Sequence, residues 1–239
     1  TTTTPSTITA RRRPASSCTQ VLDLEEWLSL TSLPDAVCEL RELRSLQLHN
    51  CTSLERLPLR IGQLTKLENL DLGADPRGSY AWCARSADAQ AASPCLSELP
   101  PSLSELISLT EIDLSGTRLP SLPACVGELP SLKRLNMTGC AELHRLCEAL
   151  PAPLEALTLN GCHRLVALPH SLSLLLSLQQ LHLNDCGALT AVPDVSRLSE
   201  LTALSLVGCG GLRAMPAGLH ELLGCCVTFD DGDVVVGSS

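Results

Sequence analysis

The sequence has few aromatic side chains, since only Trp27, Tyr80, Trp82 and Phe229 occur among 239 residues. Its hydrophobic content of 44% must therefore come mainly from aliphatic residues. No apolar run of about 18 residues occurs, so no segment is predicted to span a membrane. Basic residues are the minority charge, and the net charge of −9 argues against nucleic acid and gives no reason to expect an anionic membrane as partner.

One pattern recurs along almost the whole chain. It is clearest over residues 43 to 66, as Leu43, Leu46, Leu48, Cys51, Leu54, Leu57, Pro58, Ile61 and Leu64. Aligned on their first position, eight units begin at Thr19, Leu43, Leu67, Leu109, Leu132, Leu154, Leu178 and Leu201. Their spacing is 22 to 24 residues except for one interval of 42, which predicts an insertion. Such a period indicates a solenoid that grows by stacking.

Each unit has two halves with different periods. The LxxLxL half alternates apolar and polar residues, which predicts a strand with one buried face. The LPxxLxxL half has a spacing of three and four, which predicts a short helix or 3₁₀ turn entered through Pro34, Pro58, Pro100, Pro123 or Pro169. Because helices need more room than strands, the expected α/β fold is a gently curved solenoid with a parallel sheet on its concave face and helical turns on its convex face.

The pattern resembles the leucine-rich repeat, and the recurring cysteine resembles the intracellular repeats of plant disease-resistance receptors. That resemblance covers residues 19 to about 223. It implies a non-catalytic scaffold that binds a protein partner, in signalling or defence. Two alternatives stay open: the substrate-recognition arm of a ubiquitin ligase, and a structural subunit of a large assembly. The oligomeric state also stays open.

The expected organisation is a flexible tail or linker at 1–18, a repeat domain at 19–230 with a terminal strand, and a C-terminal tail at 231–239. The insertion lies at 76–95 and contains Tyr80 and Trp82. Residues 1 to 17 are rich in Thr and Ser and carry three arginines but no acid, so a mitochondrial targeting peptide is the alternative to a tail.

Thirteen cysteines would fit a secreted disulfide framework. Five of them share one repeat position, namely Cys51, Cys140, Cys162, Cys186 and Cys209. Stacked units would place these five thiols in a buried ladder, where they pack and pair with backbone groups at the end of each strand. The odd total also favours reduced thiols, so an intracellular and cytoplasmic protein is predicted.

The exposed strand positions are the candidate binding residues. Together with the two aromatic residues of the insertion, they form the predicted partner-binding set: Asp23, Gln47, Asp71, Glu111, Asp113, Arg134, Asn136, His182, Tyr80 and Trp82. Acidic residues dominate the N-terminal half of these columns, which predicts a partner with a basic patch. The alternative is an ordinary solvated face.

No catalytic, metal or cofactor site is predicted. Cys140, His144 and Cys147 are close in sequence, but the repeat register points them in different directions. His49 and His182 lie several units apart, with no nucleophile and orienting base beside either. The GlyCysGlyGly run at 208–211 lacks the spacing of a phosphate loop.

Overall fold

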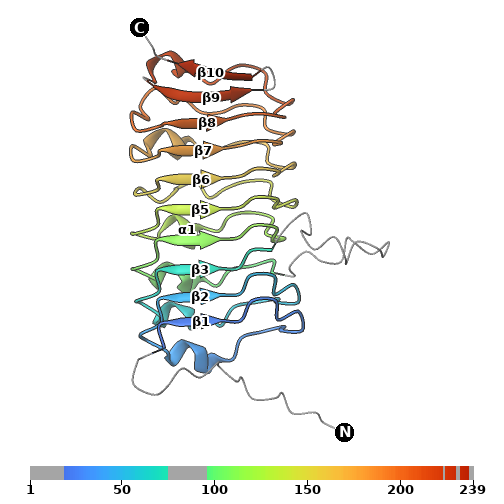
Figure 1. The fold of residues 1–239 in the computed structure, drawn as a ribbon, viewed down its shortest axis with the longest axis vertical. Coiled ribbons are helices and arrows are strands. Elements are labelled where there is room, and N and C mark those ends of the chain that lie inside the picture. The colour runs from blue at the N-terminus through green and yellow to red at the C-terminus, as the bar shows by residue number, and fades with distance from the viewer. Residues whose placement is uncertain (1–18, 75–95, 223, 230–231, 237–239) are drawn as a thin grey trace, which may run out of the picture.

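The computed structural model describes residues 19–74, 96–222, 224–229 and 232–236. One ten-stranded sheet runs along it in sequence order (Figure 1). Its strands are β1 (Val21–Asp23), β2 (Ser45–Gln47), β3 (Asn69–Asp71), β4 (Glu111–Asp113), β5 (Arg134–Asn136), β6 (Ala156–Thr158), β7 (Gln180–His182), β8 (Ala203–Ser205), β9 (Cys225–Phe229) and β10 (Gly232–Val236). Each of the eight units forms one coil, so strands β1 to β8 number coils 1 to 8.

The strands pair in parallel from β1 to β9 with no shift in register. The middle residue of each strand from β1 to β8 is a buried leucine or isoleucine, because the side-chain period of two turns that position inward. The first and third residues therefore line the opposite face in two continuous columns. This confirms the parallel sheet that the LxxLxL alternation predicted.

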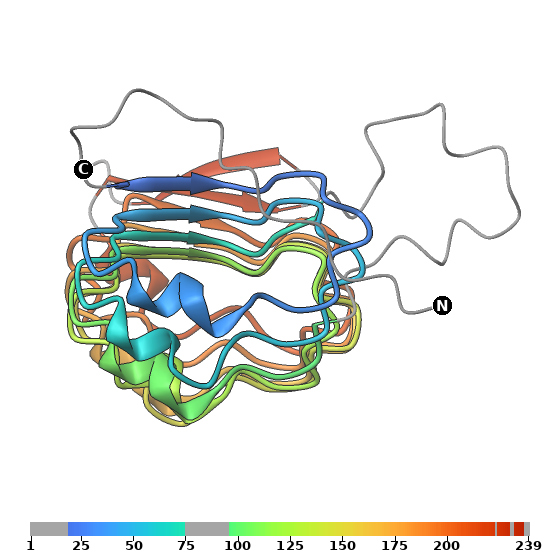
Figure 2. The same cartoon turned by 90° about the horizontal axis from the view of Figure 1, so that it is seen from below.

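Short helices cover the other side of the stack (Figure 2). They are η1 (Asp35–Glu39), η2 (Ile61–Gln63), η4 (Pro101–Glu105), α1 (Ala124–Gly127), η5 (His170–Leu174) and η6 (Leu219–Glu221). Pro34, Pro100, Pro123 and Pro169 are their N-caps, as expected, whereas η2 starts after Arg60, two residues beyond Pro58. In Figure 2, which looks along the stack, the first and last strands lie above the middle strands, on the side away from the helices. The open face of the sheet is therefore concave.

The core is a continuous leucine stack completed by the ladder cysteines. Each ladder thiol donates to a carbonyl oxygen of the preceding coil, over 3.0 to 3.2 Å: Cys51 to Leu24, Cys140 to Leu114, Cys162 to Met137, Cys186 to Leu159 and Cys209 to Leu183. These bonds tie each coil to the preceding one, and four of the five carbonyls also accept a backbone N–H of their own turn, as Leu114 accepts the N–H of Thr117 at 3.2 Å. In coil 4 the hydroxyl of Thr117 donates to Leu114 instead, at 2.7 Å.

The sheet ends in an antiparallel pair of strands. Strand β9 continues the parallel stack, and β10 then pairs back on it, with Gly232 opposite Phe229. The sheet therefore extends into the 231–239 segment, which the sequence suggested as a tail.

Candidate functional site

The open face of the sheet consists of the first and third residues of strands β1 to β8, and we call it the concave face. The third residues align directly in register as Asp23, Gln47, Asp71, Asp113, Asn136, Thr158, His182 and Ser205. Glu111, Arg134 and Gln180 belong to the column of first residues. Eight of the ten predicted binding residues thus share this face. Tyr80 and Trp82 lie outside the described residues.

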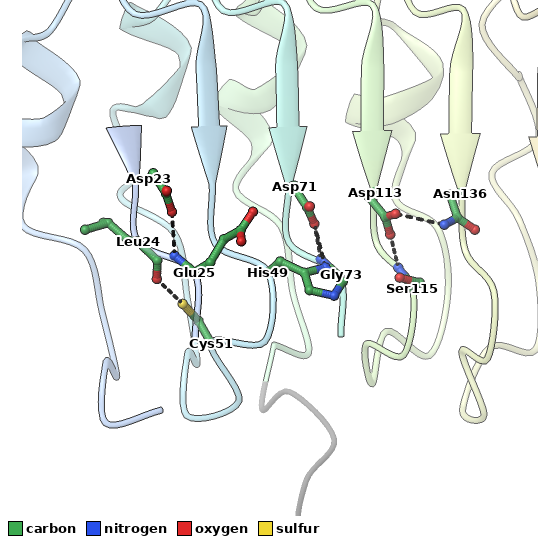
Figure 3. Close-up of polar contacts among 10 residues, drawn as sticks. All are labelled: Asp23, Leu24, Glu25, His49, Cys51, Asp71, Gly73, Asp113, Ser115 and Asn136. Atoms are coloured by element: carbon green, nitrogen blue, oxygen red, sulfur yellow. Dashed lines mark hydrogen bonds and ion pairs between the residues drawn. The ribbon is translucent and has the colours of Figure 1, made fainter. Parts of the chain in front are cut away.

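Several carboxylates of the concave face also fasten the turn that follows their strand (Figure 3). Oδ1 accepts the N–H two residues later in each case, from Glu25 to Asp23 at 3.1 Å, from Gly73 to Asp71 at 2.9 Å and from Ser115 to Asp113 at 2.7 Å. Asn136 does the same for the N–H of Thr138 at 3.0 Å. A short polar side chain that bonds to the backbone two residues on is a common turn device. These residues therefore have a structural role besides their charge.

Asp71 and Asp113 stand opposite each other on neighbouring strands, so two negative charges are close together. Burial raises the pKa of Asp71, and the charge of Asp113 acts in the same direction. The N–H of Gly73 and the imidazole of His49, whose Nδ1 lies 3.3 Å from Asp71 Oδ1, act against that rise. Asp113 Oδ2 accepts the amide N–H of Asn136 at 2.8 Å. The N-terminal half of the face is therefore acidic.

The two basic residues at the start of β5 are already paired. Arg134 donates to Glu111 at 3.0 Å, and Lys133 donates to Glu155 at 2.7 Å. Both pairs are largely exposed, so each contributes only a few tenths of a kcal/mol to about 1 kcal/mol to stability. Their main effect is to leave no excess positive charge at this point of the face.

A hollow of about 270 Å³ opens beside these pairs, over strands β4 to β7. Ala156 forms its floor. Its methyl group lies between the longer side chains of Arg134 and Gln180 in the same column, and this difference in length creates the hollow. Thr158, Gln180 and His182 make no side-chain hydrogen bond with another residue in the described part of the chain, so their polar groups are available to a ligand. The binding set proposed from the sequence lacked Ala156, Thr158 and Gln180. The signal was present, since a small residue between two long ones predicts a depression.

The side chains described here do not assemble a metal centre. His144 and Cys147 flank the buried Leu146, while the Cys140 thiol is directed to the Leu114 carbonyl. Within the described ranges, no group of three or more His, Cys, Asp or Glu residues could hold a metal ion. His49 follows β2 and His182 is the last residue of β7, so the four strands β3 to β6 lie between them.

A stack of parallel strands over buried leucines, with helical turns behind and an open polar face, defines a leucine-rich repeat solenoid. A family profile described as Zer-1-like, leucine-rich repeats, matches residues 16–144, more than half of the chain. The chain belongs to this leucine-rich repeat family. The leucine-rich repeat domain of the type III effector XopL has the same fold, with 27% identity and a TM-score of 0.61 over 88% of this chain and 76% of that one.

Plant disease-resistance proteins are also relatives, which confirms the predicted resemblance. A putative disease resistance protein of Arabidopsis thaliana is 28% identical over 233 residues, covering 87% of this chain and 18% of the relative. Disease resistance protein RPP5 of the same plant is 34% identical over 195 residues, covering 82% of this chain and 12% of the relative. The chain thus spans less than a fifth of either relative.

The helices described here are all too short to cross a membrane.

Proposed function

We propose that the chain is a non-catalytic, intracellular protein-binding domain whose concave face receives a protein partner with a basic patch. The observation that supports this most is the shared register of β1 to β4, which places Asp23, Asp71 and Asp113 in one column. Among the described residues, the one ion-pair partner of these three carboxylates is His49, which is charged only when protonated and lies 3.3 Å from Asp71. A partner with lysine or arginine side chains would complement this half of the face.

The hollow at Ala156 supports the same proposal, because it adds a depression with available polar groups next to the acidic half. A partner that reaches from Asp71 to Gln180 would meet a charged half and a neutral half. The insertion at 76–95, with Tyr80 and Trp82, is a second proposed contact, since aromatic residues are frequent interface anchors.

The relatives named as disease resistance proteins support a role in signalling or defence. We place the chain as the partner-binding part of such a protein. The proposed intracellular location rests on the thiols, because nine of the ten described cysteines are buried and five of these donate to backbone carbonyls in the ladder.

The test starts with a partner captured from cell extract and identified by mass spectrometry, whose affinity is then measured with purified proteins. The informative variant is Asp71→Asn together with Asp113→Asn, since asparagine keeps the Oδ1 acceptor and removes the charge. Lysine at these positions would also remove the turn hydrogen bonds. The control is Glu128→Gln with Glu200→Gln, an equal change of charge at exposed positions away from the concave face.

We expect the concave variant to weaken a basic partner about tenfold, equivalent to about 1.4 kcal/mol. The control should retain the affinity of the wild type. Equal affinities for all three proteins would eliminate the acidic half as the binding surface. A second variant that lacks residues 76–95 tests the insertion, and unchanged binding would remove it from the proposed interface.

A further inference from the structure

A second exposed surface runs along the side of the stack where the chain leaves the strands, the right-hand side in Figure 2. It follows the LxxL segment between each ladder position and the next helical turn. We define the lateral strip as the two middle residues of that segment in coils 4 to 8, all exposed except the partly exposed Ser121 and Thr190: Pro120, Ser121, His144, Arg145, Val166, Ala167, Thr190, Ala191, Arg213 and Ala214.

A backbone ladder holds the strip together. The N–H of His144 donates to Pro120 at 3.0 Å, and the chain of bonds continues to Val166, Thr190 and Arg213 over 3.1 to 3.3 Å. Ser121 and Arg145 also form a parallel bridge. These bonds place one position of each coil directly beside the same position of the next, so the strip is a regular surface and not a set of unrelated loops.

The charge of the strip is opposite to that of the whole chain. It carries Arg145, Arg213 and His144 but no acidic residue, in a protein of net charge −9. Neither arginine forms an ion pair within the described part of the molecule, whereas the neighbouring Arg164 is paired with Glu142. The two guanidinium groups are therefore available to carboxylates from outside.

Between the two arginines the strip is mainly apolar, with Thr190 as its one polar residue. Val166 is 49% exposed, and Ala167 and Ala191 are exposed beside it. Met215 borders the C-terminal end and is 60% exposed. An apolar centre with a cation on each side is suited to a segment that is apolar in its middle and acidic on both sides.

We propose that the lateral strip binds an extended, acidic protein segment with the pattern acidic–x–apolar–x–acidic. The spacing follows from the ladder. Arg145 and Arg213 are three coils apart, which is about 14 Å along the stack at a strand separation of about 4.8 Å, and they occupy the two adjacent positions of the strip, because Arg213 is aligned with His144 and Val166. An extended chain covers that distance in about four residues and turns alternate side chains to one face. Residues i and i+4 then meet the arginines, and residue i+2 meets Val166.

Nucleic acid is the other polyanion that arginines could bind. Two unpaired arginines and one histidine are a small footprint, and the net charge of −9 opposes a phosphate backbone. The apolar side chains at the centre of the strip would also offer no hydrogen-bond donor to a phosphate group. The observations therefore favour a protein segment, and an oligonucleotide serves as a competing probe in the test.

The probe is a phage-displayed library of random 12-residue peptides, selected on the wild-type chain and counter-selected on Arg145→Glu with Arg213→Glu. Enriched peptides are synthesised, and their affinities are measured by fluorescence anisotropy. The matched control is Arg197→Glu with Arg41→Glu, two exposed arginines away from the strip that also lack an ion pair among the described residues. Circular dichroism verifies that every variant is folded.

We expect peptides with acidic residues four apart and an apolar residue between them. Their affinity should fall at least tenfold with either strip substitution, and also with Val166→Ser, but not with the control pair or with Asp71→Asn. The proposal is overturned if the selected peptides lack acidic residues, if the control pair weakens them equally, or if no peptide is enriched. Tighter binding of a single-stranded oligonucleotide with the same arginine dependence would also overturn it.

Discussion

Asn136 and Asp113 lie opposite each other on adjacent strands, and the amide of Asn136 donates to Oδ2 of Asp113 at 2.8 Å. Each residue also uses its Oδ1 to accept the N–H two residues later, at 3.0 Å for Asn136 and 2.7 Å for Asp113. The turn thus accepts either an amide or a carboxylate. What the aspartates add to this position is negative charge, which the turn itself does not need.

Replacement of Asp71 by asparagine should therefore raise the melting temperature at pH 7. Burial raises the pKa of Asp71, so the folded state holds its proton more tightly than the unfolded state. A group of this kind stabilises the fold below its unfolded pKa, near 3.8, and that stability is lost as the pH rises through the folded pKa. The gain from Asp71→Asn should accordingly disappear below about pH 4. Thermal unfolding at pH 3.5 and pH 7 measures both values.

Asp194→Asn is the matched control, because Asp194 Oδ1 accepts the N–H of Ser196 at 2.9 Å in the same kind of turn. Here the hydrogen bond lowers the pKa of the carboxyl group, so its ionised form favours folding above the unfolded pKa. Asp194→Asn should lower the melting temperature at pH 7. A rise for both variants, or for neither, would contradict this explanation.

The ladder thiols should be unreactive in the folded protein, whereas Cys226 should react. Burial raises the pKa of Cys140 to about 11 and that of Cys186 to about 12, and it raises the pKa of Cys162 further. The thiolate is the reactive form, so all three should resist alkylation at pH 8. Cys226 is exposed. Iodoacetamide treatment followed by site-resolved mass spectrometry measures each cysteine separately.

A denatured sample is the control for this labelling, and there the same three cysteines should become reactive. Rapid native labelling of Cys162 would mean that the coils open on the timescale of the reaction. A disulfide at any ladder position would contradict the reduced ladder and the intracellular location proposed from it.

The repeat pattern predicted the sheet well because its physical cause is local. Leucines at the fourth and sixth positions of LxxLxL point to one side of the strand, and that alone determines which residues reach the open face. Asp23, Gln47 and Asp71 were therefore assigned to one column from spacing only, and the register agrees. The position of the ladder cysteines followed from the same count.

The contacts between coils could not be predicted in this way. Pairing of Lys133 with Glu155 and of Arg134 with Glu111 depends on side-chain conformation, which the repeat pattern does not determine. The dual role of Asp71 and Asp113 was also missed. An aspartate two residues before a turn N–H is a recognisable signal, but in this repeat it coincides with the exposed position that suggests binding.

The hollow should be sensitive to an added side chain on its floor. Ala156→Tyr places a ring between Arg134 and Gln180 on the open face of the sheet. The ring does not enter the core, because the side chain that β6 turns into the core is that of Leu157. We expect at least a tenfold loss of affinity for a partner of the concave face, with a melting temperature close to that of the wild type. Ala141→Tyr, at an exposed turn residue, is the control. Full affinity in the Ala156 variant would show that the partner does not use the hollow.

Gly127→Ala tests how closely the coils pack on the convex side. Alanine is favoured over glycine in helices by about 1 kcal/mol, so helix propensity alone predicts a more stable protein. A Cβ at this position of α1 would lie only 2.0 Å from the carbonyl oxygen of Ala149 in the next coil. The backbone would have to shift, and we expect a loss of about 2 to 3 kcal/mol in the free energy of unfolding. Gly187→Ala, which meets nothing within 4 Å, should change it by less than about 0.5 kcal/mol. Urea denaturation of both variants decides the question, since equal stabilities would mean that coils 4 and 5 can separate at no cost.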